Sequence, residues 1–196
     1  MKLKKIAVIA ALTGVLSACI STTKVGSGPV KMGDSMQLTL GKAWNQVNAN
    51  GLNGPHRDTW TLEGLPVDTL MVYSGVNDGE IIHPERASQN DKKNFIFKST
   101  MNAEQIVALF QGDLTRDGST FELLKLEPSV FGGSKGYHFE FRILRKTDNL
   151  EVLGNADMSV IKGKLYALVY QAPKLTFYPS HIESVRQVAQ SVKIAS

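Results

Sequence analysis

Cys19 is the residue whose chemistry is most clearly specified by its surroundings. It is the only cysteine among 196 residues, so its thiol has no partner for an intrachain disulfide. Lys2, Lys4 and Lys5 begin the chain, and an uncharged, mostly apolar run follows from Ile6 to Leu16. This order is typical of a secretory leader. A run of about 11 residues would span roughly 16 Å as a helix, too short for a hydrocarbon core of about 30 Å, so the sequence predicts export rather than a permanent membrane span.

The leader ends on Leu16-Ser17-Ala18-Cys19, which resembles the lipobox of bacterial lipoproteins. The resemblance implies cleavage between Ala18 and Cys19, a diacylglycerol on the thiol, and an acyl chain such as palmitate on the new amine. Two or three acyl chains, at about 0.8 kcal/mol per buried CH₂, would make the membrane anchor practically permanent. In this family an Asp after the cysteine commonly signals inner-membrane retention, so Ile20 favours the periplasmic face of the outer membrane. The alternative is a leader with a cysteine at its boundary by coincidence.

The four histidines show no recognisable metal-binding pattern. His56, His83, His138 and His181 are scattered, and no two have the close spacing that zinc ligands usually show. We therefore predict loop or surface positions for them. His138 is the exception and the histidine of most interest for function, because it faces away from the apolar residues of its strand. We expect it to lie beside Glu140 only in sequence.

Three other patterns fall short of a functional site. Asp113 and Asp117 resemble the start of an EF-hand loop, but Leu124 occupies the position where a bidentate Glu is required. The stretch Gly132-Gly133-Ser134-Lys135-Gly136 lacks the Walker spacing, which predicts a flexible connection rather than a phosphate site. No serine, Ser134 included, lies in a nucleophile-elbow context. We expect no catalytic, cofactor-binding or metal-binding residues, and the two tryptophans, Trp44 and Trp60, are expected in the core.

The charge of the chain excludes one class of partner. The formal net charge is +4, but three of the 22 basic residues lie in the leader, which leaves 19 against 18 acidic residues. A nearly neutral mature chain has no electrostatic footprint for nucleic acid. Residues 1–18 are predicted to be the signal peptide and residues 19–29 a lipidated cysteine with a flexible tether. Residues 30–196 are enough for a single domain with a real core.

Alternating apolar and polar residues predict a mainly antiparallel sheet. The clearest strand runs from Tyr137 to Ile143, and turns at Asp148-Asn149 and Lys162-Gly163 extend it into a three-stranded meander. The last strand of the meander is apolar on both faces, so Tyr166 and Tyr170 are expected to be buried. The other predicted strands cover residues 36–40, 58–64, 67–75, 95–97 and 121–126, the last of these stopped by Pro128.

Two amphipathic helices are predicted. The first begins at Asn102, an N-cap candidate with Gln105 at the third helical position, and ends at Asp117-Gly118. The second opens at Pro179-Ser180, where Ser180 to Glu183 form a capping box. Between these elements, Trp44 and Val47 predict one further helical turn, and residues 76–94 an exposed excursion.

The order of these elements is similar to that of the PsbP/Mog family. The similarity covers about residues 58–194, includes the terminal helix that follows the buried strand of residues 164–170, and is topological. It implies an α+β fold in which an antiparallel sheet lies between helices. Known members of the family are accessory and binding proteins, with no shared catalytic residues to transfer.

These observations lead us to expect an envelope lipoprotein whose domain binds a protein or another envelope component, without catalysis and without a cofactor. The alternative is a small periplasmic hydrolase or ligand-transforming enzyme whose site is assembled from distant residues. A third interpretation is a periplasmic spacer. A pocket with convergent polar groups, or a sheet edge or apolar patch, would separate these possibilities.

Overall fold

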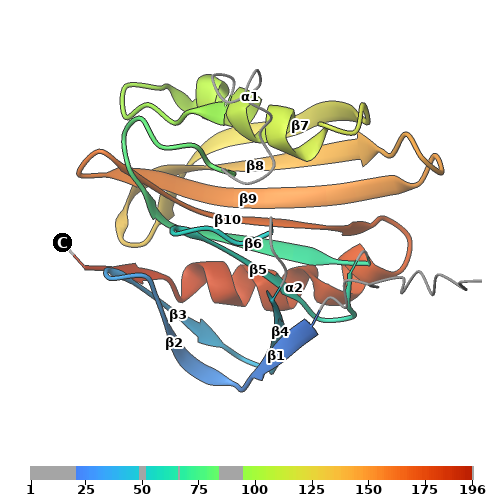
Figure 1. The fold of residues 1–196 in the computed structure, drawn as a ribbon, viewed down its shortest axis with the longest axis horizontal. Coiled ribbons are helices and arrows are strands. Elements are labelled where there is room, and N and C mark those ends of the chain that lie inside the picture. Colours follow the sequence, from blue (N-terminus) through green and yellow to red (C-terminus); the bar gives the residue numbers. More distant parts are fainter. Residues whose placement is uncertain (1–20, 49–51, 66, 84–94, 196) are drawn as a thin grey trace, which may run out of the picture.

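A computed structural model shows a long antiparallel sheet between two helical layers (Figure 1). It describes residues 21–48, 52–65, 67–83 and 95–195. The two helices are α1 (Ala103–Leu114) and α2 (Phe177–Gln190). The strands are β1 (Ser21–Val25), β2 (Gly28–Met32), β3 (Met36–Leu40), β4 (Trp44–Asn48), β5 (Arg57–Thr61), β6 (Thr69–Val76), β7 (Thr120–Phe131), β8 (Ser134–Leu144), β9 (Glu151–Ile161), β10 (Lys164–Pro173) and β11 (Lys193–Ile194).

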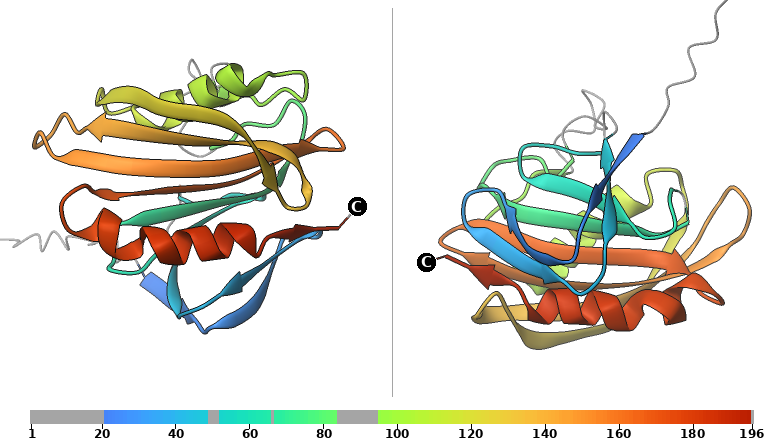
Figure 2. Two further views of the ribbon diagram at one scale, coloured as in Figure 1. Left: turned by 180° about the vertical axis from the view of Figure 1, so that it is seen from behind. Right: turned by 90° about the horizontal axis from the view of Figure 1, so that it is seen from below.

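Eight strands form the main sheet in the order β1-β4-β5-β6-β10-β9-β8-β7, and β11-β3-β2 form a smaller second sheet. All neighbouring pairs are antiparallel. In Figures 1 and 2, α1 lies on one side of the main sheet, whereas α2 and the small sheet lie on the other. The predicted α+β class and the C-terminal meander, β8-β9-β10, are confirmed. No helix among the described residues is long and apolar enough to cross a membrane.

Strand β10 lies in the interior of the domain, as its apolar sequence predicts. Leu165, Ala167 and Val169 pack into the core under α1, whereas the alternate side chains, Tyr166 and Tyr170 among them, pack into the core under α2. Tyr166 is 4% exposed and Tyr170 is fully buried. Both faces of the strand are therefore covered, which explains the absence of polar alternation.

Helix α1 begins where the sequence predicts. The Asn102 side chain accepts a hydrogen bond from the Gln105 backbone N–H, and the Gln105 side chain accepts one from the Asn102 N–H, which is a complete capping box. The predicted end at Asp117-Gly118 is wrong, because the helix ends at Leu114. A separate turn follows, in which the Gly118 N–H donates to the carbonyl of Thr115.

The predicted start of α2 is also wrong by several residues. The helix begins at Phe177, and Pro179 lies in its first turn, where a proline is tolerated because those N–H groups have no acceptor within the helix. The Ser180 hydroxyl donates to the carbonyl of Thr176, four residues earlier, so the predicted capping box at Ser180 does not form.

The N-terminal region is more ordered than predicted. Residues 21–25 form β1 and pair with β4, and residues 28–32 form β2, so the prediction of a flexible tether is wrong for these residues. Trp44 and Val47 lie in β4 rather than in a helical turn, since β1 and β5 satisfy the backbone of β4 in a way that one isolated turn would not. The predicted signal peptide and Cys19 lie outside the described residues.

Strand β7 is longer than predicted because it lies at an edge of the sheet. It continues through Pro128 to Phe131, and an edge strand tolerates a proline whose missing N–H faces away from its one neighbour. The predicted loop of residues 132–136 is a two-residue turn, since Gly132 and Gly133 have φ angles of 61° and 81° and β8 starts at Ser134.

The region after β6 is partly buried rather than exposed. Ile82 is 1% exposed and His83 is 2% exposed, which contradicts the predicted exposed excursion at these positions. The rest of that stretch, residues 84–94, lies outside the described residues. The predicted strand at residues 95–97 is reduced to a single bridge between Ile81 and Ile96.

Candidate functional site

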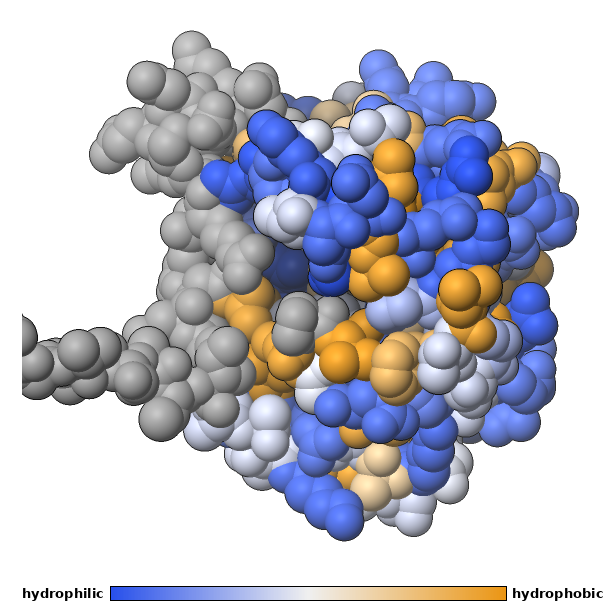
Figure 3. All heavy atoms as spheres, turned by 90° about the vertical axis from the view of Figure 1, so that its right-hand side faces the viewer, coloured by the Kyte–Doolittle hydropathy of each residue, from blue (hydrophilic) through white to orange (hydrophobic). Residues whose placement is uncertain are grey.

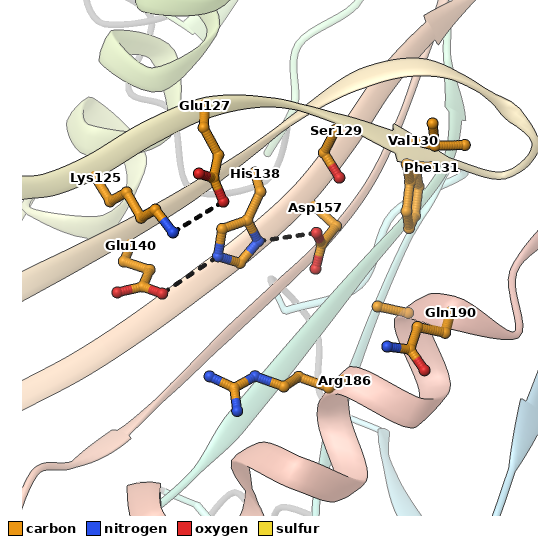
Figure 4. Close-up of a pocket in the computed structure, with 11 residues that line it drawn as sticks. Lys125, Glu127, Ser129, Val130, Phe131, His138, Glu140, Asp157, Arg186 and Gln190 are labelled. Carbon is orange, nitrogen blue, oxygen red and sulfur yellow. Dashed lines mark hydrogen bonds and ion pairs between the residues drawn. The ribbon is translucent and has the colours of Figure 1, made fainter.

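A polar cleft opens where α2 leaves part of the sheet uncovered. Helix α2 packs against β10, β9 and β3, and the cleft lies between its C-terminal half and β7, β8 and β9 (Figure 4). Its volume is about 330 Å³. Its polar lining consists of Lys125, Glu127, Ser129, His138, Glu140, Asp157, Arg186 and Gln190.

Strand register brings these side chains together. Glu127 of β7 lies opposite His138 of β8, which lies opposite Asp157 of β9. In the next row on the same face, Lys125 lies opposite Glu140. Directly opposed residues on one face of an antiparallel pair lie close enough for their side chains to interact. The result is a set of alternating charges across three strands.

His138 is held between two carboxylates. Its Nδ1 lies 2.9 Å from Asp157 Oδ1, and its Nε2 lies 3.5 Å from Glu140 Oε1. The hydrogen bond to Asp157, opposed by partial burial and assisted by Glu140, raises the pKa of His138 above its ordinary value. The carboxylate on either side of the ring therefore stabilises the protonated imidazole relative to the neutral one.

The contact between His138 and Glu140 corrects the expectation that they are neighbours only in sequence. Residues two apart in a strand point to the same face, because successive side chains alternate. Both side chains consequently lie on the α2 side of β8, opposite to Phe139 and Phe141 in the core under α1.

Arg186 brings positive charge from the helix to the other side of the cleft. In Figure 4 it projects from α2 opposite His138 and Glu140. Its only ion pair among the described residues is a distant one with Glu183, at 4.0 Å, and its side chain is 53% exposed. Lys125 and His138 each have a carboxylate partner at 2.9 Å, so Arg186 is the cleft cation with the weakest partner within the domain.

The charge of Arg186 also acts on the nearby Tyr178. Burial, followed by the charge of Glu140, raises the pKa of Tyr178 to about 12, and Arg186 opposes this effect.

The arrangement does not match an activated nucleophile. Such a site needs a neutral imidazole whose free nitrogen accepts a proton from a hydroxyl or thiol. Here Nε2 faces Glu140, whereas Ser129 lies on the Asp157 side of the ring (Figure 4). Among the described residues, no hydrogen bond joins Ser129 to His138. The geometry instead suits the binding of polar or charged groups.

The raised pKa of His138 gives a testable pH dependence. In an NMR titration we expect its imidazole to titrate above 6.5, and Asp157→Asn to lower that pKa because the largest stabilising contact is removed. The free energy that the pair contributes to folding is fully present below pH 6.5 and is lost as pH rises through the raised pKa. Asp157→Asn should therefore destabilise the protein more at pH 5.5 than at pH 9. Glu140→Gln, the control, should lower the pKa of His138 less than Asp157→Asn does. Equal shifts from the two variants would show that Asp157 is not the main cause of the raised pKa.

The other histidines also lie beside carboxylates. The pairs are His56 with Glu80 (3.6 Å), His83 with Asp113 (3.0 Å) and His181 with Glu63 (2.9 Å). His83 is 2% exposed but lies in the connection between β6 and α1, whereas His181 is 8% exposed and lies in α2, so the prediction of loop or surface positions is wrong for His181. A counter-charge offsets the cost of burying a polar ring, and sequence spacing does not reveal such distant partners. Among the described residues, no group of three or more candidate ligands is arranged to hold a metal ion.

Asp113 belongs to a buried cluster that connects α1 to the sheet. Its Oδ1 lies 3.0 Å from His83 Nδ1, and its Oδ2 lies 3.9 Å from Arg57 Nη2. The Arg57 guanidinium in turn lies 5.6 Å from the ring centroid of Tyr73. Asp117, the other residue of the EF-hand-like pattern, instead accepts hydrogen bonds from the Ser119 backbone and hydroxyl. Trp44 and Trp60, each 1% exposed, lie in the core as expected.

Comparison with known proteins supports the fold. No protein-family model matches the chain, and no curated protein matches it in sequence. The solution structure of cyanobacterial PsbP (CyanoP) from Synechocystis sp. PCC 6803 matches with a TM-score of 0.56 and 17% identity, over 91% of this chain and 95% of that one. The fold is PsbP-like. The predicted architectural resemblance is thereby confirmed.

Two further solved structures match with lower TM-scores. The Ran-binding protein Mog1p of Saccharomyces cerevisiae has a TM-score of 0.47 and 9% identity, over 91% of this chain and 97% of that one. LpqN of Mycobacterium tuberculosis, which is involved in cell envelope biogenesis, has a TM-score of 0.35 and 10% identity, over 90% and 92% of the two chains. Likenesses at this level do not indicate a shared function.

Proposed function

We propose that the protein is a bacterial envelope lipoprotein, anchored through Cys19 to the periplasmic face of the outer membrane, whose domain binds a partner without catalysing a reaction. The lipobox-like Leu16–Cys19 and the residue that follows it support the anchor and its location. The cleft between α2 and β7–β9 is the observation that carries the binding function, because it gathers positive and negative side chains on one accessible surface.

The chemistry of the cleft favours part of a macromolecule over a small enclosed ligand. At about 330 Å³ the cleft is near the lower end of small-molecule pockets, which are mostly apolar. Its rim residues Lys125 and Glu127 have side chains 47% and 46% exposed. We infer that it receives a polar segment of an envelope protein, with an acidic group of that segment against Arg186.

Catalysis by the same groups is the alternative to binding. The His138–Asp157 pair would suit a general base with an orienting acid. Two features oppose this role. The contact with Asp157 raises the pKa of His138 and so favours its protonated form, and its second nitrogen is directed at Glu140. The cleft therefore supports charge recognition better than proton abstraction.

The anchoring part of the proposal predicts an all-or-none change in fractionation. Cys19→Ala should leave an unprocessed or soluble chain that no longer fractionates with membranes, because no thiol remains to carry the diacylglycerol. Membrane fractionation and mass spectrometry of the N-terminus in exporting bacterial cells would measure this. Cys19→Ser, which also lacks the thiol, is the control for size. A variant that stays membrane-bound with a normally cleaved leader would show that the anchor is not on this residue.

The binding part predicts that charge at Arg186 matters. A photocrosslinking amino acid at Val130, a cleft residue 73% exposed, should form an adduct with an envelope protein in intact cells. Arg186→Glu should reduce that adduct about tenfold, which corresponds to ~1.4 kcal/mol. Lys164→Glu, the same charge change at an exposed position elsewhere, is the matched control. Equal adducts from both variants, or none from the unaltered protein, would refute binding at the cleft.

A further inference from the structure

We infer that the anchored domain lies directly against the bilayer along its β1 edge, so that the cleft at the opposite edge of the sheet points away from the membrane. This orientation rests on the proposed lipid on Cys19. It differs from what the predicted flexible tether of residues 19–29 would allow, since such a tether would leave the domain free to move relative to the bilayer.

The chain between the proposed anchor and the folded domain is very short. Strand β1 begins at Ser21, so Ile20 is the only residue between it and Cys19. A fully extended chain spans at most about 3.6 Å per residue, which places Ser21 within about 7 Å of Cys19. The headgroup region on each side of a bilayer is itself about 5–7 Å thick. With its acyl chains in the hydrocarbon, the acylated residue therefore holds the start of β1 at the level of the headgroups.

The exposed side chains of β1 are polar. The first four residues of the strand are exposed, and their side chains end in hydroxyl or ammonium groups. They are Ser21, Thr22, Thr23 and Lys24. Such groups suit a surface of phosphate and glycerol oxygens, and a lysine near anionic lipids contributes roughly 1 kcal/mol. None of the four is apolar, so the contact predicted is with headgroups and not with acyl chains.

The exposed apolar residues elsewhere do not offer a better membrane-binding surface. Leu175, in the turn between β10 and α2, is 88% exposed and is the most exposed of the large hydrophobic residues described. Figure 3, which views the molecule from the side where that turn lies, shows hydrophobic side chains separated by hydrophilic ones rather than one continuous apolar face. Leu175 alone would bury too little area to orient the domain against the short N-terminal connection. The other exposed large hydrophobic residues lie on β7 and β8, at the end of the sheet that contact along β1 directs away from the bilayer: Leu123, Leu124, Val130, Tyr137 and Leu144.

The cleft lies at the end of the sheet opposite to β1. Strands β1 and β7 are the two ends of the eight-stranded sheet, and the cleft involves β7, β8 and β9. At about 4.8 Å per strand the seven intervals between β1 and β7 amount to roughly 34 Å along the sheet. In the right-hand view of Figure 2, β1 lies at the top of the domain and β7 at the bottom. Contact along β1 thus presents the cleft to the periplasm.

Contact quenching on vesicles tests this orientation. The mature chain, expressed without its leader so that the Cys19 thiol is free, would be coupled to maleimide-bearing lipid in phosphatidylethanolamine–phosphatidylglycerol vesicles that contain nitroxide-labelled headgroups. A fluorescent amino acid replaces either Thr22 of β1 or Val130 of β7, both exposed. We expect loss of most fluorescence at position 22 and no loss at position 130, relative to the same proteins capped with N-ethylmaleimide.

Insertion of ten Gly and Ser residues between Ile20 and Ser21 is the matched control, and it should abolish the quenching at position 22. Quenching at position 130, or at neither position, would overturn the inference. Because chemical coupling replaces lipidation in the cell, this experiment tests the geometry even if Cys19→Ala leaves fractionation unchanged. Failure of the orientation and failure of the proposed anchor are therefore distinguishable.

Discussion

Asp113→Ala should lower the free energy of unfolding by about 3–5 kcal/mol, because it leaves a buried arginine without its counter-charge. The side chains of Arg57 and Asp113 are 6% and 3% exposed, and no other carboxylate among the described residues pairs with Arg57. Two guanidinium nitrogens, Nε and Nη1, are already buried without a hydrogen-bond partner. Removal of the remaining negative charge would therefore expose the full cost of burying the cation. Urea unfolding, followed by the fluorescence of the two buried tryptophans, would measure the loss.

A double variant separates the charge from the packing at this position. Arg57→Met combined with Asp113→Leu removes both charges and keeps comparable volume, so it should recover most of the stability lost in Asp113→Ala. A double variant as unstable as the single one would show that the hydrogen bond to His83 or the local packing, and not the uncompensated charge, is responsible.

The pH dependence of the same cluster has a definite sign. Burial alone would raise the pKa of Asp113, but the hydrogen bond with His83 and the charge of Arg57 outweigh burial and lower it below the ordinary value near 3.8. The stabilising contribution is therefore present above pH 3.8 and is lost as pH falls through the lowered pKa. Asp113→Ala should accordingly cost less at pH 2 than at pH 7.

Local signals in the sequence were sufficient where the chain folds with its near neighbours. The capping box at Asn102 depends on contacts within three residues, and the Lys162-Gly163 turn joins strands that pair directly across it. The burial of Tyr166 and Tyr170 follows from an apolar run too long to have an exposed face. Such features need no knowledge of distant residues, and the structure confirms them.

The N-terminal strands were missed because their partners are distant. Residues 21–25 are mostly small and polar, without the alternation that indicates a half-buried strand. They become a strand by pairing with β4, whose first residue, Trp44, is 19 positions after Val25 and lies opposite it. Tertiary pairing thus overrides the local preference for an irregular tether. That error also hid the short connection to Cys19 on which the inferred orientation depends.

The sequence predicts the candidate site only in part, because the register between strands determines which side chains lie opposite one another. A two-residue turn at Asp148-Asn149 would have paired Thr147 with Leu150 and, counting outward, His138 with Ser159. The observed connection spans residues 145–150, between Leu144 and its partner Glu151, and this places Asp157 opposite His138 instead. Arg186 adds a second obstacle, since it reaches the cleft from a helix that packs back across the sheet. The sequence indicated one feature of the site, because His138 and Glu140 are two residues apart in a strand and therefore point to the same face.

Gly136→Ala should cost about 3 kcal/mol of folding free energy, the upper end of what overpacking usually costs. A Cβ at this position would collide with the carbonyl oxygen of Met158 on the neighbouring strand β9. A side chain could rotate away from such a contact, but this atom is backbone, so β8 and β9 would have to separate. The same two strands position His138 and Asp157, and we expect the raised pKa of His138 to fall as well.

Gly133→Ala, in the adjacent turn, is the matched control because its cost has a different origin. A Cβ there meets nothing within 4 Å, but the φ of +81° is unfavourable for any residue with a side chain, so about 1 kcal/mol is expected. Urea unfolding combined with the NMR titration of His138 distinguishes the two causes. Equal losses, with the pKa of His138 unchanged in both variants, would show that β8 and β9 are not held together through Gly136. The larger effect at Gly136 would establish that this glycine-rich stretch serves close strand packing, which its composition alone does not distinguish from a flexible loop.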